Sequence, residues 1–194
     1  INFAELPQND LYPQSGILQF FINPNDDLYG LNFDDQQIQD GFRVIFYDAV
    51  TEDQTGLVQD FPAFSDDGYS PVSGQSAIQF TKSESYIDLN NFDFSERVTD
   101  PFAKDDEEDF CDEYGELFSA NGHRLGGYPF FTQTDPREHN ESFQDYVLLL
   151  QIDTDDTDGV EIMWGDSGVG NFFIHPEDLK KRDFSKVVYN WDCY

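Results

Sequence analysis

The sequence is poor in basic residues, and this shortage excludes two classes of partner. Only 10 of the 194 residues are Lys or Arg, against 40 Asp and Glu, so the formal net charge is −30. Proteins bind a nucleic-acid backbone by replacing its counterions with basic side chains, and anionic membrane surfaces attract basic segments. We therefore expect neither nucleic acid nor a membrane surface as a partner.

Cysteine, histidine and long apolar runs are also scarce. The two cysteines, Cys111 and Cys193, form no Cys-x-x-Cys motif, and the three histidines have no ligand-like spacing. We expect both thiols to be reduced and buried, because a chain of this length can form a core without a cross-link. No apolar run approaches the ~18 residues that a membrane span needs. A cytoplasmic location is therefore expected.

Aromatic residues are abundant instead. They make up 16% of the chain, with 20 Phe, and hydrophobic residues make up 38%. A disordered acidic chain is poor in aromatics, whereas aromatic and β-branched side chains favour pleated sheets. The composition thus predicts a folded, β-rich domain.

Segments with strand-like patterns occur along the whole chain. Short apolar or alternating runs bounded by turn residues indicate strands. They fall at residues 16–22, 42–47, 76–81, 86–89, 146–152, 160–164, 171–174 and 187–193, the last with alternating polarity. The continuous apolar run at 146–152 favours a strand covered on both faces, and Asp158-Gly159 predicts a hairpin turn.

Two segments have helical signals. Between residues 104 and 122, one helical face carries Phe110, Tyr114, Leu117 and Phe118. Five acids at 105–109 suit the start of this helix, and Asn121-Gly122 predicts its end. Residues 175–182 have Pro near the first helical position, acids at the start and bases at the end, which predicts a second helix.

One short motif resembles a catalytic one. Gly165-Asp166-Ser167-Gly168 matches the nucleophile loop of chymotrypsin-like proteases. Val169 replaces the next Gly, and His123 lies too close before Ser167 for the chain order of that fold. We interpret the motif as a tight turn, and we predict no catalytic residue.

An aspartate-rich run from Asp153 to Gly159 resembles a calcium loop. As an EF-hand loop it would place Thr154 and Gly165 where acids are required, so that interpretation fails. Two alternatives remain. The tip is either an irregular Ca²⁺ site made by Asp155, Asp156 and Asp158, or a solvated hairpin. No other cofactor is predicted.

The segment Gly126-Gly127-Tyr128-Pro129 contains two residues that permit positive φ, followed by a proline that restricts Tyr128 to extended geometry. Arg124 and Arg137 flank it as scarce cations in an acidic chain. They either grip a ligand carboxylate or pair with neighbouring acids.

Several blocks together resemble the bacterial YwqG-like family. They are residues 123–133, 148–153, 163–168 and 189–194, with residues 16–22 earlier in the chain. The resemblance spans essentially the whole sequence. It implies a β-dominated mixed fold with an internal duplication, and an upstream segment with a first Gly-Gly-x-Pro block. The family is a domain of unknown function, so the resemblance implies no catalytic residues.

These observations predict an α+β, mainly β fold with largely antiparallel or mixed sheets and two or three short helices. We expect one domain, residues 1–194, N-terminally truncated, with pseudo-repeat halves of about residues 1–100 and 101–194. The duplication has an echo in the sequence: Ile1-Asn2 followed by Gly16-Ile17 resembles Ile152-Asp153 followed by Gly159-Val160.

Two functions fit the sequence. The first is a non-enzymatic binding protein whose acidic surface takes a basic protein partner, as acidic immunity proteins do with basic toxins. The second is a small-molecule-binding protein or enzyme with a cleft near the two most distinctive blocks. Its candidate residues are His123, Tyr128, Gln133, Arg137, Trp164 and Asp166.

Overall fold

The computed structural model describes residues 1–51, 53–58, 69–99, 107–157 and 159–194. Its strands are β1 (Ile17–Ile22), β2 (Phe42–Tyr47), β3 (Val72–Ser73), β4 (Val147–Asp153), β5 (Glu161–Ile162), β6 (Val169–Ile174) and β7 (Val188–Asp192). The α-helices are α1 (Phe94–Arg97), α2 (Glu107–Leu117) and α3 (Pro176–Lys181), with 3₁₀ turns at Phe3–Glu5, Gln54–Gly56 and Glu141–Phe143. The predicted α+β, mainly β class is confirmed.

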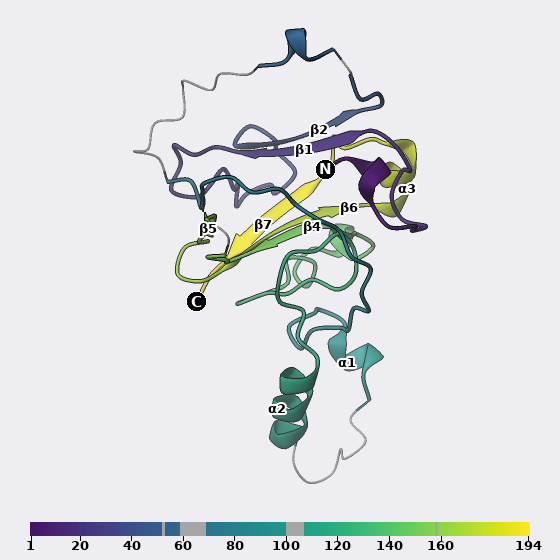
Figure 1. Cartoon of the computed structure of the whole chain (residues 1–194). Helices are drawn as coiled ribbons and strands as arrows, with labels where there is room; N and C mark the ends of the chain where they lie inside the picture. Colours follow the sequence, from purple (N-terminus) through teal and green to yellow (C-terminus); the bar gives the residue numbers. More distant parts are fainter. Residues whose placement is uncertain (52, 59–68, 100–106, 158) are drawn as a thin grey trace.

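A three-stranded antiparallel sheet in the order β4-β6-β7 forms the centre of the fold. The antiparallel pair β1-β2 lies across one face of this sheet, while α1 and α2 project from the other side (Figure 1). β3 and β5 form a short antiparallel pair. In the described part of the chain, no helix is long and apolar enough to cross a bilayer.

The main core lies between β1-β2 and the central sheet. Phe20 of β1 packs on Phe172 of β6 with ring centroids 4.9 Å apart, and Phe42 of β2 packs on Tyr189 of β7 at 5.1 Å. A second buried cluster, which includes Phe131, contains Leu148 of β4, Phe173 of β6 and Val188 of β7. Both faces of the central sheet are therefore covered, as the apolar run at 146–152 predicts.

Two predicted strands are absent. Residues 76–81 and 86–89 form no strand, and residues 76–79 are exposed to solvent. Alternating polarity produces a strand only where a neighbouring backbone completes the hydrogen-bond ladder, and no such partner is among the described residues. The predicted strand 160–164 is reduced to β5. The predicted terminal strand 187–193 is confirmed as β7, which is buried at four of its five positions although its sequence alternates in polarity.

The helix predictions hold with one correction. α3 begins after His175, whose side chain accepts a hydrogen bond from the Glu177 N–H, and ends at Arg182 in the left-handed region. α2 ends at Leu117 rather than at Asn121-Gly122, and Leu117 is 73% exposed. After α2 the chain turns so that Phe118 packs on Tyr86 at 4.7 Å, which leaves Leu117 facing solvent. The predicted acids at 105 and 106 lie outside the described residues.

Both cysteines are free thiols, as predicted, but Cys111 and Cys193 are half-buried rather than buried. The residues Gly165 to Gly168 form a tight turn, as predicted. The Gly168 N–H donates to the Trp164 carbonyl at 2.7 Å, and Ser167 has a φ of 69°.

Candidate functional site

A cleft of about 430 Å³ opens between three segments that are distant in sequence. These are the N-terminal residues 6–12, the extended stretch 79–85, and residues 121–127 next to the edge of β4. Polar and small side chains dominate its lining, which consists of Leu6, Pro7, Gln8, Asn9, Tyr12, Gln79, Phe80, Thr81, Lys82, Ser83, Ser85, Asn121, His123, Arg124, Leu125, Gly126 and Gly127. We call this cavity the Arg124 cleft.

Tyr12 lies at the buried side of the Arg124 cleft. Its hydroxyl donates to the Leu149 carbonyl at 2.8 Å, where β4 has an irregularity in its pairing with β6. Burial raises the pKa of Tyr12, so the hydroxyl stays protonated and keeps this donor role. Gly126 has a φ of +67°, and a Cβ atom there would lie 3.1 Å from the Leu11 side chain. The glycine therefore lets residues 121–127 approach the N-terminal segment closely.

The backbone of Arg124 is hydrogen-bonded to β4 of the central sheet. Its N–H donates to the Gln151 carbonyl at 3.1 Å, and the Gln151 N–H donates to the Arg124 carbonyl at 2.8 Å. This isolated bridge extends the central sheet by one residue beyond β4. The cleft wall is thus part of the rigid core.

Among the residues that the structure describes, the guanidinium of Arg124 forms hydrogen bonds only with neutral oxygens. Its Nη1 donates to the Tyr128 carbonyl at 3.2 Å and to Ser85 Oγ at 3.4 Å, and its Nη2 donates to the Asn121 carbonyl at 2.6 Å. Its Nε is buried and has no partner among the described residues. Burial lowers the pKa of Arg124, although the charges of Asp153 and Asp88 oppose this. The group nevertheless remains a cation at neutral pH.

His123, a predicted site residue, joins the Arg124 cleft to the aspartate-rich hairpin. Its Nδ1 accepts the Asp153 N–H at 3.0 Å, and its Nε2 lies 3.1 Å from Asp155 Oδ2. Because Nδ1 is an acceptor, the neutral ring carries its proton on Nε2 and donates it to Asp155. Hydrogen bonds from Thr157 and then from His123 lower the pKa of Asp155.

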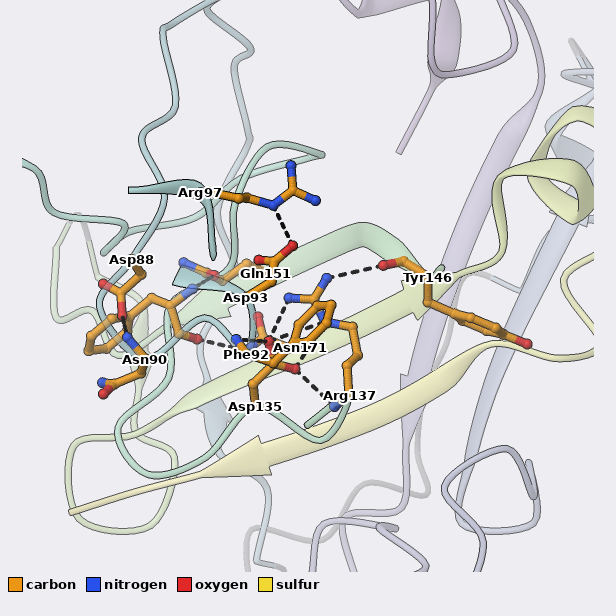
Figure 2. Close-up of polar contacts among 11 residues, drawn as sticks. Asp88, Asn90, Phe92, Asp93, Arg97, Asp135, Arg137, Tyr146, Gln151 and Asn171 are labelled. Atoms are coloured by element: carbon orange, nitrogen blue, oxygen red, sulfur yellow. Dashed lines mark hydrogen bonds and ion pairs between the residues drawn. The ribbon is translucent and has the colours of Figure 1, made fainter. Parts of the chain in front are cut away.

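Arg137, another predicted site residue, is paired with a neighbouring acid (Figure 2). Its Nε donates to Asp135 Oδ1 at 2.9 Å and its Nη2 to Asp135 Oδ2 at 2.7 Å, which is a side-on, bidentate pair. Its Nη1 donates to the Tyr146 carbonyl at 3.1 Å. The guanidinium lies between the rings of Phe92 and Phe173, 4.9 and 5.0 Å from their centroids. We call this cluster the Arg137 centre.

The other four predicted residues are dispersed. Tyr128 lies beside the Arg124 cleft, where its N–H donates to Ser85 Oγ at 2.9 Å. Gln133 is exposed and donates to the Cys193 carbonyl, Trp164 is 2% exposed in the main core, and Asp166 is exposed in the Gly165 turn. In the described part of the chain, no hydrogen bond or ion pair joins two of the six side chains. Only His123 lines the cleft.

A family model described as Domain of unknown function (DUF1963) matches residues 1–193. The chain belongs to this family. The expectation that it is a domain of unknown function is confirmed, and no curated protein matches the chain.

In this DUF1963 domain, the predicted calcium loop contains no evident metal cluster. No group of three or more His, Cys, Asp or Glu side chains is arranged to hold a metal among the described residues. Asp155 accepts the Thr157 N–H at 2.9 Å, so its carboxylate already has local partners. Asp158 lies outside the described residues, and the Ca²⁺ alternative remains a prediction.

Sequence reasoning singled out Arg124 as a scarce cation but did not place it in the candidate site. Tyr12, Lys82 and Ser85 were missed entirely. The Gly126-Gly127 pair was the one local signal, because two flexible residues next to a scarce arginine indicate close backbone approach. Nothing local links that pair to residues 6–12 of this DUF1963 domain.

Proposed function

We propose that this DUF1963 domain is a non-enzymatic protein that binds a small molecule in the Arg124 cleft. The observation that carries the proposal is a half-buried arginine, in a cleft of about 430 Å³, that has no carboxylate partner among the residues that the structure describes. Ligand pockets commonly have volumes of roughly 300–1,000 Å³ and contain a few convergent polar groups.

The lining favours binding over catalysis. Its polar side chains are amides, hydroxyls, two basic groups and one histidine, its other residues are apolar or glycine, and no cysteine is among the lining residues that the structure describes. A nucleophile needs an adjacent general base, but the Nδ1 of His123 accepts a backbone N–H and its Nε2 faces Asp155. Ser83 and Ser85 therefore have no evident activating base among the described residues.

The proposal is tested by blocking the cleft. Ser83 is exposed and lines the cleft, so Ser83→Trp should fill it, whereas Ser95→Trp places the same ring on exposed α1 as a matched control. A panel of small metabolites is screened by protein NMR, with the amides of Ser85, Gly126 and Gly127 as reporters. We expect a binder to shift these amides, to lose its effect in Ser83→Trp and to keep it in Ser95→Trp. Binding that survives Ser83→Trp would refute the proposal.

A basic protein partner is the second candidate. Its support is that only six acidic side chains take part in ion pairs among the described residues, two of them with histidine. The chain has 40 acids, so much negative charge is available for a cationic surface. Co-purification of one specific basic protein that stays bound at physiological salt supports this candidate. Capture of many proteins, all released by salt, counts against it.

Three finer assignments from the sequence complete the proposal. We assign the domain to the bacterial YwqG-like group and to the cytoplasm, and we retain the internal duplication about residues 1–100 and 101–194. A Ca²⁺ site at Asp155, Asp156 and Asp158 is tested by calorimetric titration, where an absence of heat would exclude useful affinity.

A further inference from the structure

We infer that the ligand of the Arg124 cleft is a small anion whose carboxylate or phosphate group binds Arg124. This inference rests on the proposed function and names the chemical class that the cleft accepts. Three observations support it: the charge of the lining side chains, the hydrogen bonds of the Arg124 guanidinium, and the hydrogen bonds of the nearest acids.

The lining of the cleft is opposite in charge to the rest of the molecule. None of the described residues that line it is acidic, although the whole chain has 40 acids. Lys82 and Arg124 line the same cavity, together with His123. A second hollow, next to Phe143, is instead lined by Asp34 and Asp35 and by no basic residue that the structure describes. Local positive charge is therefore a property of the Arg124 cleft, and an anion is its complementary ligand.

Arg137 shows how a guanidinium is saturated in this protein. Its side edge, formed by Nε and Nη2, takes both oxygens of Asp135. On Arg124 the same edge has no carboxylate in the described part of the chain, because its Nε is buried without a partner and its Nη2 binds one carbonyl. An arginine has five N–H donors, and a buried donor without an acceptor is unfavourable. A ligand carboxylate or phosphate in the cleft supplies a charged acceptor to the accessible part of this guanidinium, where Nη2 binds the Asn121 carbonyl at the surface.

The nearest acids do not replace such a ligand. Asp88 and Asp153 are the carboxylates whose charges act on Arg124, but neither forms an ion pair with it in the described structure. Asp88 accepts the Asn90 N–H at 2.9 Å, and Asp153 accepts the N–H groups of Gly122 and Thr154 at 2.6 and 2.8 Å. Both carboxylates thus accept backbone N–H groups and not the N–H groups of Arg124, so the guanidinium charge remains available to the cleft.

The net charge limits the size of the anion. A molecule with a formal charge of −30 repels polyanions over distances of about a Debye length, ~10 Å at 0.1 M salt. A small mono- or dianion meets less of this repulsion and fits a cleft of about 430 Å³. A carboxylate and a phosphate satisfy the same donors, so the experiment has an arm for each.

The experiment is an NMR titration of the intact chain at constant ionic strength, adjusted with NaCl. The probes are acetate and succinate for carboxylates, inorganic phosphate for phosphates, and glycerol and acetamide as neutral controls. We expect saturable shifts of the Arg124 Nε–H signal and of the Gly126 and Gly127 amides with at least one anion, and none with the neutral probes. Arg124→Gln should weaken binding about ten- to a hundredfold, the effect of losing a charge-assisted contact.

Two further variants keep the test decisive. Arg43→Gln removes an exposed arginine from β2, outside the cleft, and should leave the affinity unchanged. Arg124→Lys keeps the charge without the bidentate edge, and it should bind more weakly than the native chain and more tightly than Arg124→Gln. All variants are first checked for a native-like spectrum.

The outcomes distinguish failure of the anion inference from failure of the proposed function. Neutral metabolites that bind the cleft equally well in Arg124→Gln would overturn the anion inference and leave the proposed function intact. Anion shifts that are linear with concentration, or equal in Arg124→Gln, would also overturn the inference. If no anion and no metabolite of the screening panel shifts the cleft amides, both the inference and the proposed function are refuted.

Discussion

The Arg124 cleft and the Arg137 centre each contain an arginine guanidinium. In the Arg137 centre it is paired with a carboxylate, and in the Arg124 cleft it binds neutral oxygens among the described residues. Arg137 is 6% exposed and binds a fully buried carboxylate two residues earlier in the chain. Arg124 is surrounded by carbonyl and hydroxyl oxygens and keeps one edge without a carboxylate. The difference shows that neutral acceptors can hold a guanidinium in place without neutralising it. The first arrangement fits a structural role and the second a binding role.

The largest expected effect on the free energy of unfolding comes from breaking the ion pair between Arg137 and Asp135. Arg137→Met leaves the buried Asp135 carboxylate without its cation, and breaking one side of a buried pair costs about 3–5 kcal/mol. The free energy of unfolding is measured by urea denaturation. Asp135→Asn should also destabilise the domain, because it leaves the arginine charge buried. A loss below about 1 kcal/mol in Arg137→Met would contradict the structural role of this centre.

The second-largest effect on the free energy of unfolding is expected at Tyr12, on the buried side of the Arg124 cleft. Tyr12→Phe removes the donor to the Leu149 carbonyl, and a buried acceptor left without a partner costs about 1–3 kcal/mol. The irregular pairing of β4 at this position leaves that carbonyl dependent on the hydroxyl. Urea denaturation measures the change, and Tyr47→Phe at an exposed position of β2 is the matched control. Equal stabilities of the two variants would show that Tyr12 acts only through its ring.

A smaller effect is expected at Arg124 itself. Arg124→Met loses hydrogen bonds to three neutral oxygens, which lowers the stability of the folded state. It also removes a partly buried charge that has no ion pair among the described residues, which raises that stability, so the two effects oppose each other. We expect the free energy of unfolding to change by less than about 1 kcal/mol, well below the effect of Arg137→Met. The same denaturation measurement tests both. A loss as large as that of Arg137→Met would remove the contrast between the two arginines and make Arg124 a structural residue.

The sequence predicted those parts of the fold in which a local pattern and its tertiary partner agree. Residues 16–22 and 42–47 form β1 and β2 because the two strands pair with each other. The similar pattern at 76–81 forms no strand, since periodicity does not reveal whether a partner backbone is near. The class of the fold was therefore predictable, and the number of its strands was not.

The candidate site was less predictable for the same physical reason. The Arg124 cleft brings residues 6–12 and 79–85 against residues 121–127, and contacts over such separations leave no periodic signal. The sequence has Asp135 and Glu138 close to Arg137 and no acid within about seven residues of Arg124, but nearness along the chain does not reveal which side chains pair. What separates them is Asp135, whose backbone turn directs its carboxylate onto the side edge of Arg137.

The smallest expected effect is a pH dependence that originates beside the Arg124 cleft. Burial raises the pKa of Asp88 above its usual 3.8, although the Asn90 N–H and the charge of Arg124 oppose this. The folded state then binds a proton more readily than the unfolded state, so stability is lost as the pH rises through the raised pKa. Lowering the pH from 6 to 4 should therefore stabilise the native chain relative to Asp88→Asn, which lacks the titrating group.

Asp53 is the matched control for Asp88, because a hydrogen bond from Thr55 lowers its pKa. Asp53→Asn should therefore follow the native profile over most of this range. Melting temperatures of the three proteins across this range measure the difference. Parallel profiles of the native chain and Asp88→Asn would show that the carboxylate titrates as if exposed, and the charge of Asp88 would then act on Arg124 over this whole pH range.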